Sequence, residues 1–369
     1  MRSKILFVAL LLILISSCQL GRFIFYNFAD IKDYKIFPKR DLLANNNPFV
    51  FPKGKSDAAR VPKGLTIKGK EVGFDKFLSE NKTVAFLIIH NDTLVYEKYF
   101  GGYDSASIVP SFSMAKSYVS ALIGCAIDDG LILSVEQPVT DFIPELKKNG
   151  FEKVKIRHLL QMTSGLDFKE SYYDPFGEAA TFYYGTDLTE STIHLTLKRE
   201  PGKAFDYTSG TSQILGLILT RALKGEDLTH YFNRKLWFPL EMEFDGSWSI
   251  DKNNGIEKTF CCLNARARDF AKFGRLYMHK GDWHGKQLIS SKWIEQSTTP
   301  DEFEAGTKFY KYQWWLMDGD PDKAFYAQGH LGQYIYVNPK RNLIIVRLGK
   351  DYGNVNWQSI FASYAMTVD

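Results

Sequence analysis

Two stretches of alternating or β-branched hydrophobic residues, one near each end of the chain, predict antiparallel strand pairs. Residues 83–89 and 93–99 are strand-like, and the polar residues 90–92 between them have turn chemistry, so a β-hairpin is expected. Residues 332–337 and 342–348, joined by Pro339-Lys340-Arg341, predict a second hairpin.

Most of the intervening chain has apolar runs that end in glycine or in turn residues, which is typical of helices. The predicted helices cover residues 113–127, 156–162, 212–224, 263–280 and 356–366. Strands at both ends with helices between them predict an α+β fold, an α/β sandwich. In it, an antiparallel sheet built from both chain ends is flanked by helices and carries an inserted, mainly helical lobe.

The first residues have the pattern of an export signal. Arg2 and Lys4 precede a short apolar run that ends in Ile15-Ser16-Ser17-Cys18. This resembles a bacterial lipoprotein signal peptide over residues 1–17, with Cys18 as the lipidated first residue of the mature chain. We therefore expect an exported lipoprotein tethered to a membrane, periplasmic or at the cell surface. A plain signal peptide and an uncleaved anchor are the alternatives.

Residues 18–75 contain four scattered prolines and predict a tether and an extended N-terminal arm, and residues 76–369 predict one domain. With 45% hydrophobic and 24% charged residues, the 369-residue chain has ordinary globular composition. The net charge of +4 comes without a dense basic block, so nucleic-acid binding is not indicated.

The cysteines and histidines do not form a metal-binding pattern. Cys125 lies inside an apolar helix and is expected to be buried. Cys261 and Cys262 are adjacent, and we expect no bridge between them because disulfide geometry strains so short a ring. Without a Cys-Xaa-Xaa-Cys, a close histidine pair or a nucleotide-binding glycine loop, we expect no metal and no cofactor.

The tetrapeptide Ser113-Met114-Ala115-Lys116 opens the first predicted helix. A serine and a lysine three residues apart share one helix face, and an amine beside a hydroxyl can activate a serine without histidine. Burial and the helix N-terminus would lower the pKa of Lys116, so that it could act as a base. The same spacing occurs at Ser79/Lys82 and Ser249/Lys252, but in polar, turn-rich surroundings.

Two further segments carry candidate chemistry. Tyr207 lies in a loop before the helix predicted at 212–224, where positive neighbours would lower its pKa and let it pass protons. A buried tyrosine that caps the helix is the alternative. The glycine-rich segment 328–333 at the start of a strand indicates close approach of a ligand, with a backbone N–H available to an oxyanion. A bulge or a sheet corner is the alternative there.

In this order the motifs resemble the serine hydrolases related to penicillin-binding proteins and class C β-lactamases, in the esterase and aminohexanoate-oligomer hydrolase branch. The resemblance spans roughly residues 80–350 and includes segments 158–166 and 267–274. It implies Ser113 as nucleophile, Lys116 as its base, and Tyr207 as general acid or base. It also implies an oxyanion hole from the backbone N–H groups of Ser113 and Gln333, and substrate binding by Ser209, His330 and Gly332.

Two departures from the family pattern shape the expected function. Ser209 stands where an asparagine is usual, and His330, largely neutral at pH 7, stands where a lysine binds the β-lactam carboxylate. We therefore expect an enzyme that cleaves a small ester or amide through an acyl-enzyme, with lactamase activity disfavoured. The alternatives are a penicillin-binding-like sensor without turnover and a D-amino-acid peptidase or cell-wall enzyme. Besides the lipid anchor and a small-molecule or peptide substrate, no partner is indicated, and a monomer is expected.

Overall fold

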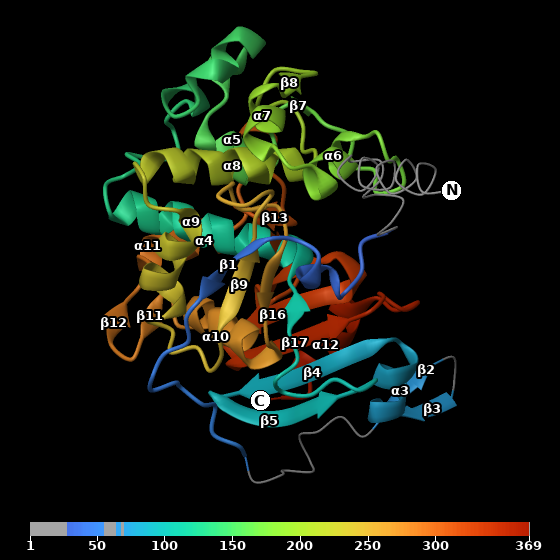
Figure 1. Ribbon diagram of the computed structural model, residues 1–369. Coiled ribbons are helices and arrows are strands. Elements are labelled where there is room, and N and C mark those ends of the chain that lie inside the picture. Colours follow the sequence, from blue (N-terminus) through green and yellow to red (C-terminus); the bar gives the residue numbers. More distant parts are fainter. Residues whose placement is uncertain (1–27, 55–63, 68–69, 369) are drawn as a thin grey trace, which may run out of the picture.

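The computed structural model describes residues 28–54, 64–67 and 70–368 (Figure 1). The predicted signal peptide over residues 1–17 and the predicted lipidation site, Cys18, lie outside these residues. Within the described ranges, no helix has both the length and the apolar character needed to cross a bilayer.

A seven-stranded antiparallel sheet forms the centre of the domain, with the order β13-β14-β15-β16-β17-β4-β5. The strand from the first predicted hairpin, β4, pairs directly with β17 from the second, so the prediction of a sheet built from both chain ends is confirmed. The strands are β4 (Thr83–His90), β5 (Thr93–Tyr99), β13 (Tyr310–Lys311), β14 (Trp314–Leu316), β15 (Phe325–Gly329), β16 (Gln333–Asn338) and β17 (Leu343–Gly349).

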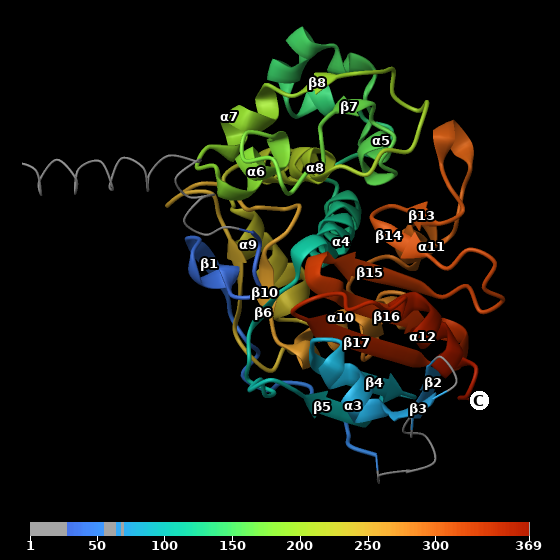
Figure 2. The same cartoon turned by 90° about the vertical axis from the view of Figure 1, so that its right-hand side faces the viewer.

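Helices cover both faces of this sheet, and the burial of its central strands follows from that. All residues of β4 and β17 are buried, and their side chains alternate between two hydrophobic clusters. On one face the cluster includes α3 (Phe74–Glu80) and α12 (Trp357–Ala365). On the other face it includes α10 (Ala267–Met278) and α4 (Ala115–Asp128) (Figure 2).

The inserted helical lobe packs on α4 through α8 (Ser209–Ala222). In Figure 1 it lies above the sheet, with α8 next to α4. Its other helices are α5 (Ile156–Leu160), α6 (Glu178–Tyr184), α7 (Leu188–Ile193) and α9 (Leu228–Phe232). The lobe and the sheet domain therefore meet along α4, whose N-terminus carries the predicted nucleophile.

A second sheet, of order β1-β9-β10-β6, fixes the N-terminal arm to the domain. Its strands are β1 (Lys39–Leu42), β6 (Val109–Pro110), β9 (Gly246–Ser249) and β10 (Leu263–Ala265). The prediction that residues 263–280 form one helix was therefore wrong at its start. Residues 263–265 pair with β9 and β6, and α10 begins after the extended residue Arg266.

The remaining elements are short or peripheral. They are the hairpins β2 (Gly64–Ile67)/β3 (Lys70–Gly73), β7 (Leu166–Asp167)/β8 (Thr196–Leu197) and β11 (Asp282–Trp283)/β12 (Lys286–Gln287), and helix α11 (Ser291–Thr298). The predicted boundary between arm and domain, at residue 75, falls inside α3.

Candidate active site

Ser113 lies in a single turn of 3₁₀-helix, Phe112–Met114, immediately before α4. Phe112 in this turn has φ +44°, a conformation that L-residues adopt only under local constraint. Strand β15 passes so close to this turn that a side chain at Gly329 would collide with the carbonyl of Ser111. The turn thus holds Ser113 at the junction of the sheet and the helical lobe.

Lys116 is 1% exposed, and its Nζ atom lies 2.9 Å from Ser113 Oγ, so the predicted pair is in contact. The same Nζ is 2.9 Å from the carbonyl oxygen of Phe260 and 3.3 Å from Ser209 Oγ. Burial lowers the pKa of Lys116 to about 8, and the nearby Glu170 carboxylate partly opposes that shift. At neutral pH a useful fraction of this amine is therefore uncharged.

Tyr207 approaches the same hydroxyl from the loop before α8. Its side chain is hydrogen-bonded to Ser113, its ring stacks on Trp315 at 5.5 Å, and Lys116 Nζ lies 5.1 Å from the ring centre. The prediction that its pKa falls was wrong. Burial raises the pKa of Tyr207, and the hydrogen bond to Ser113 opposes that increase only in part. Tyr207 is therefore a neutral phenol.

Ser209, the first residue of α8, connects Lys116 to an acid that the sequence did not reveal. Its backbone N–H donates to Glu170 Oε2 at 2.7 Å and its hydroxyl donates to Glu170 Oε1 at 2.6 Å. The Tyr172 hydroxyl donates to the same Oε1 at 2.7 Å. Because Glu170 lies in a loop and belongs to no motif, only the folded arrangement identifies it.

The glycine-rich segment 328–333 forms the tight turn of the hairpin between β15 and β16, in which Gly329 pairs with Gln333. His330 lines the pocket beside Ser113 and packs against the rings of Phe112 and Tyr172. Gly332, with φ +80°, faces the buried Arg347 guanidinium, and the Gln333 side chain hydrogen-bonds to Gly349 and to the carbonyl of His330. Of the predicted residues in this segment, His330, Gly332 and Gln333, only His330 lines the pocket. Burial lowers its pKa, so its imidazole is neutral at pH 7.

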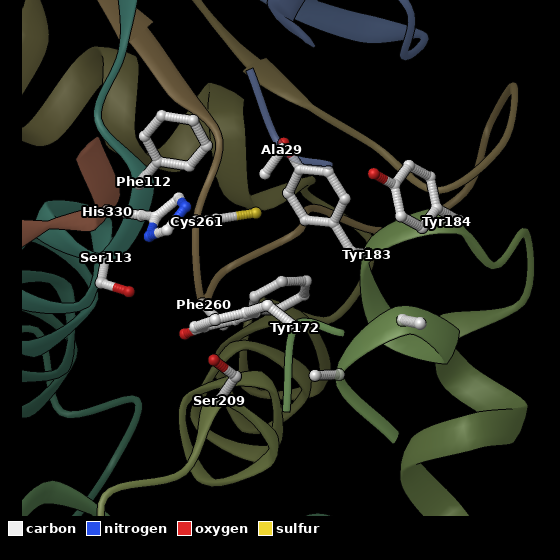
Figure 3. Close-up of a pocket in the computed structure, with 12 residues that line it drawn as sticks. Ala29, Phe112, Ser113, Tyr172, Tyr183, Tyr184, Ser209, Phe260, Cys261 and His330 are labelled. Atoms are coloured by element: carbon white, nitrogen blue, oxygen red, sulfur yellow. The ribbon is translucent and has the colours of Figure 1, made fainter. Parts of the chain in front are cut away.

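An apolar pocket adjoins Ser113, and Figure 3 shows the side chains of Ser113 and Ser209 directed into the same space. Ala29 of the arm and Ala179 and Ala180 of α6 form part of its wall. Aromatic rings form most of the rest, namely those of Phe112, Tyr172, Tyr183, Tyr184, Phe260 and His330. Among the described residues that line the pocket there is no lysine or arginine.

Cys261, also in the pocket wall, forms a disulfide with Cys262, so the prediction that these adjacent cysteines do not bridge was wrong. Whether neighbours can bridge depends on local backbone conformation, and here Cys262 has φ +74°. Surrounding hydrogen bonds hold this loop, from Ser249 N–H to the Cys262 carbonyl and from Trp248 Nε1–H to the Cys261 carbonyl.

Cys125 is a buried free thiol, as predicted. The described residues contain no group of three or more His, Cys, Asp or Glu arranged to hold a metal ion.

Comparisons with known proteins agree with this fold. The chain is 25% identical over 319 residues to the 6-aminohexanoate-dimer hydrolase of Paenarthrobacter ureafaciens, covering 79% of each protein. A solved Bacillus anthracis structure, described as a candidate 6-aminohexanoate-dimer hydrolase, superposes with a TM-score of 0.80 at 25% identity, covering 91% of each chain. A family VIII carboxylesterase shares the fold, with a TM-score of 0.61 and 17% identity over 76% of this chain and 91% of its own.

The proteins that this chain resembles thus include one named as a hydrolase of the 6-aminohexanoate dimer and, by fold alone, one named as a carboxylesterase. The model of the Beta-lactamase family matches residues 74–358, which is more than half of the chain. The chain belongs to the Beta-lactamase family.

Proposed function

We propose that this protein is a serine hydrolase that cleaves a small, uncharged ester or amide through an acyl-enzyme on Ser113. The contact that carries the proposal is the 2.9 Å approach of the buried Lys116 amine to Ser113 Oγ, with Tyr207 hydrogen-bonded to the same hydroxyl. The apolar pocket without a fixed cation favours an apolar acyl group over a carboxylate-bearing β-lactam.

Acylation begins when Ser113 Oγ attacks the substrate carbonyl carbon and its proton passes to neutral Lys116. Backbone N–H groups stabilise the tetrahedral oxyanion. One is that of Ser113. We assign the second to His330 in place of the predicted Gln333, because His330 is the residue of the β15–β16 turn that lines the pocket.

Collapse of the intermediate breaks the bond to the leaving alcohol or amine, which takes a proton from the neutral Tyr207 phenol. The ammonium of Lys116 then returns its proton to Tyr207. Deacylation reverses these transfers with water in place of the leaving group, so that acid and alcohol or amine are released and Ser113 is restored.

The test compares Ser113→Ala with the unchanged protein, using p-nitrophenyl esters, nitrocefin and a serine-directed phosphonate followed by intact mass. We expect one phosphonate per chain and ester turnover in the unchanged protein. Both should be lost in Ser113→Ala, with turnover falling by at least about 10³-fold. Ser79→Ala is the matched control, since Ser79 is an exposed serine with a lysine three residues on. It should behave as the unchanged protein.

Other results would redirect the proposal. Phosphonate labelling that survives Ser113→Ala would refute Ser113 as the nucleophile. Labelling without turnover of any ester would favour the sensor alternative. Nitrocefin hydrolysis as fast as ester hydrolysis would contradict the preference for a substrate without a carboxylate.

A further inference from the structure

Glu170 holds Ser209 through two separate oxygens. The Ser209 backbone N–H donates to Oε2 and the Ser209 hydroxyl donates to Oε1. The backbone N–H lies at the N-terminus of α8, where a carboxylate is also favoured by the helix dipole. This two-point contact fixes the position of the Ser209 side chain and the direction of its proton.

The direction of that proton determines what Ser209 presents to Lys116. A hydroxyl has one donor and two acceptor lone pairs. Because its single proton is committed to Glu170, Ser209 Oγ can only accept a hydrogen bond from Lys116 Nζ, 3.3 Å away. The other neighbour, the Phe260 carbonyl oxygen at 2.9 Å, is also an acceptor only.

An uncharged lysine amine has two N–H donors and one lone pair. Its two donors are satisfied by Ser209 Oγ and the Phe260 carbonyl, so the lone pair is directed to the remaining neighbour, Ser113 Oγ. We infer that Glu170 is a positioning residue that, by taking the Ser209 proton, directs the Lys116 lone pair at Ser113. This inference rests on the proposed function, because it requires Lys116 to act as the base.

Electrostatics give this role a second signature. The groups facing Lys116 Nζ are the Ser113 hydroxyl, the Tyr207 ring, Ser209 from α8 and the Phe260 carbonyl. Glu170, behind Ser209, is the charged group that raises the pKa of Lys116 against the larger effect of burial. Removing its charge should therefore lower that pKa further.

Glu170→Gln tests the inference because glutamine offers one acceptor and one donor where Glu170 offers two acceptors. The amide oxygen can accept the fixed Ser209 N–H. The amide N–H₂ then faces Ser209 Oγ and turns the hydroxyl proton toward Lys116, where it competes for the lone pair. If Glu170 only stabilised the N-terminus of α8, Glu170→Gln would weaken that contact but would not turn the Ser209 proton toward Lys116.

The measurement is the rate of Ser113 phosphonylation between about pH 6 and about pH 10, which reports the state of the base without requiring turnover. In the unchanged protein the rate should rise with pH and level off above the Lys116 pKa of about 8. In Glu170→Gln the rising limb should move to lower pH while the plateau rate falls about tenfold. The control, Glu178→Gln, changes an exposed acid at the start of α6 and should leave the profile unaltered.

Ser209→Ala completes a double-mutant cycle. If Glu170 acts through the Ser209 hydroxyl, adding Glu170→Gln to Ser209→Ala should reduce the plateau rate by less than about twofold further. The change in pH profile should remain, because the charge of Glu170 acts through space. Independent, additive losses of plateau rate would overturn the inference, as would a Glu170→Gln profile that superposes on that of the unchanged protein.

The same labelling experiment distinguishes failure of the proposed function from failure of this inference. An unchanged protein that takes up no phosphonate at Ser113 would refute the nucleophile and this inference with it. Normal labelling with an unaltered Glu170→Gln profile would refute only the role of Glu170.

Discussion

The two sides of the pocket differ in the kind of contact that they offer: one is polar and hydrogen-bonded, and the other is mainly apolar. On the side of α4 and α8, Ser113, Lys116, Ser209 and Glu170 form a continuous chain of hydrogen bonds. On the side of α6, aromatic rings and the small side chains of Ala179 and Ala180 offer area but few polar groups. The first side specifies where each proton lies, and the second specifies mainly the shape and polarity of what can enter.

Because of this difference, substitutions on the polar side should mainly affect the reaction rate, and substitutions on the apolar side should mainly affect substrate selectivity. A polar chain in a buried site works only when every donor meets an acceptor, so removing one member disturbs the others. An apolar wall contributes many weak contacts, so a change there shifts preference among substrates. Substitutions on the two sides should therefore leave different kinetic signatures.

Lys116→Met should have the largest effect, because it removes the base while keeping a side chain of similar length. We expect kcat/KM for p-nitrophenyl acetate to fall by about 10³-fold, with most of the loss in kcat. The matched control is Lys252→Met, since Lys252 follows Ser249 at the same spacing but lies exposed in an ion pair with Asp187. A loss confined to KM would contradict the role of Lys116 as the base.

Ala180→Leu probes the apolar side and should produce a smaller, selective effect. Ala180 is a buried residue of α6 that lines the pocket, so a larger side chain there takes space from the acyl group. We expect the ratio of kcat/KM for p-nitrophenyl hexanoate to kcat/KM for p-nitrophenyl acetate to be about tenfold lower in the variant than in the unchanged protein. Equal losses for both esters would show that this wall does not hold the acyl chain.

The same contrast explains what could be predicted from the sequence. The hairpins at residues 83–99 and 332–348 followed from local alternation, and the structure confirms both. The Ser113–Lys116 contact followed from helical spacing alone. Residues 263–265 were assigned to a helix because their pairing partners lie far away in sequence, where no local pattern could reveal them.

The errors within the site have a common physical origin. The pKa of Tyr207 depends on how deeply the fold buries it, and the sequence showed only its neighbours in the chain. Glu170 acquires its place from three hydrogen-bond donors that meet only after folding. Motifs thus indicated the groups that we propose to react, whereas the groups proposed to orient them could be identified only from the three-dimensional structure.

The loop that contains the Cys261–Cys262 disulfide contributes to both sides of the pocket, and opening this disulfide should have the smallest effect of the three changes. Cys261 belongs to the apolar wall, and the preceding residue, Phe260, supplies the carbonyl that accepts a hydrogen bond from Lys116. Opening the bridge frees the peptide units on either side of it, so this carbonyl should be held less firmly. We expect reduction by dithiothreitol to lower kcat about three- to tenfold, because small displacements of orienting groups are costly.

The double variant Cys261→Ser/Cys262→Ser separates this effect from any other action of the reductant. It should start at the lowered kcat and then show no response to dithiothreitol, while the buried thiol of Cys125 remains in both proteins. If the double variant kept full kcat, the backbone hydrogen bonds of Cys261 and Cys262 would suffice to hold the loop. If it lost selectivity among acyl chains but kept kcat, the disulfide would belong with the apolar wall alone.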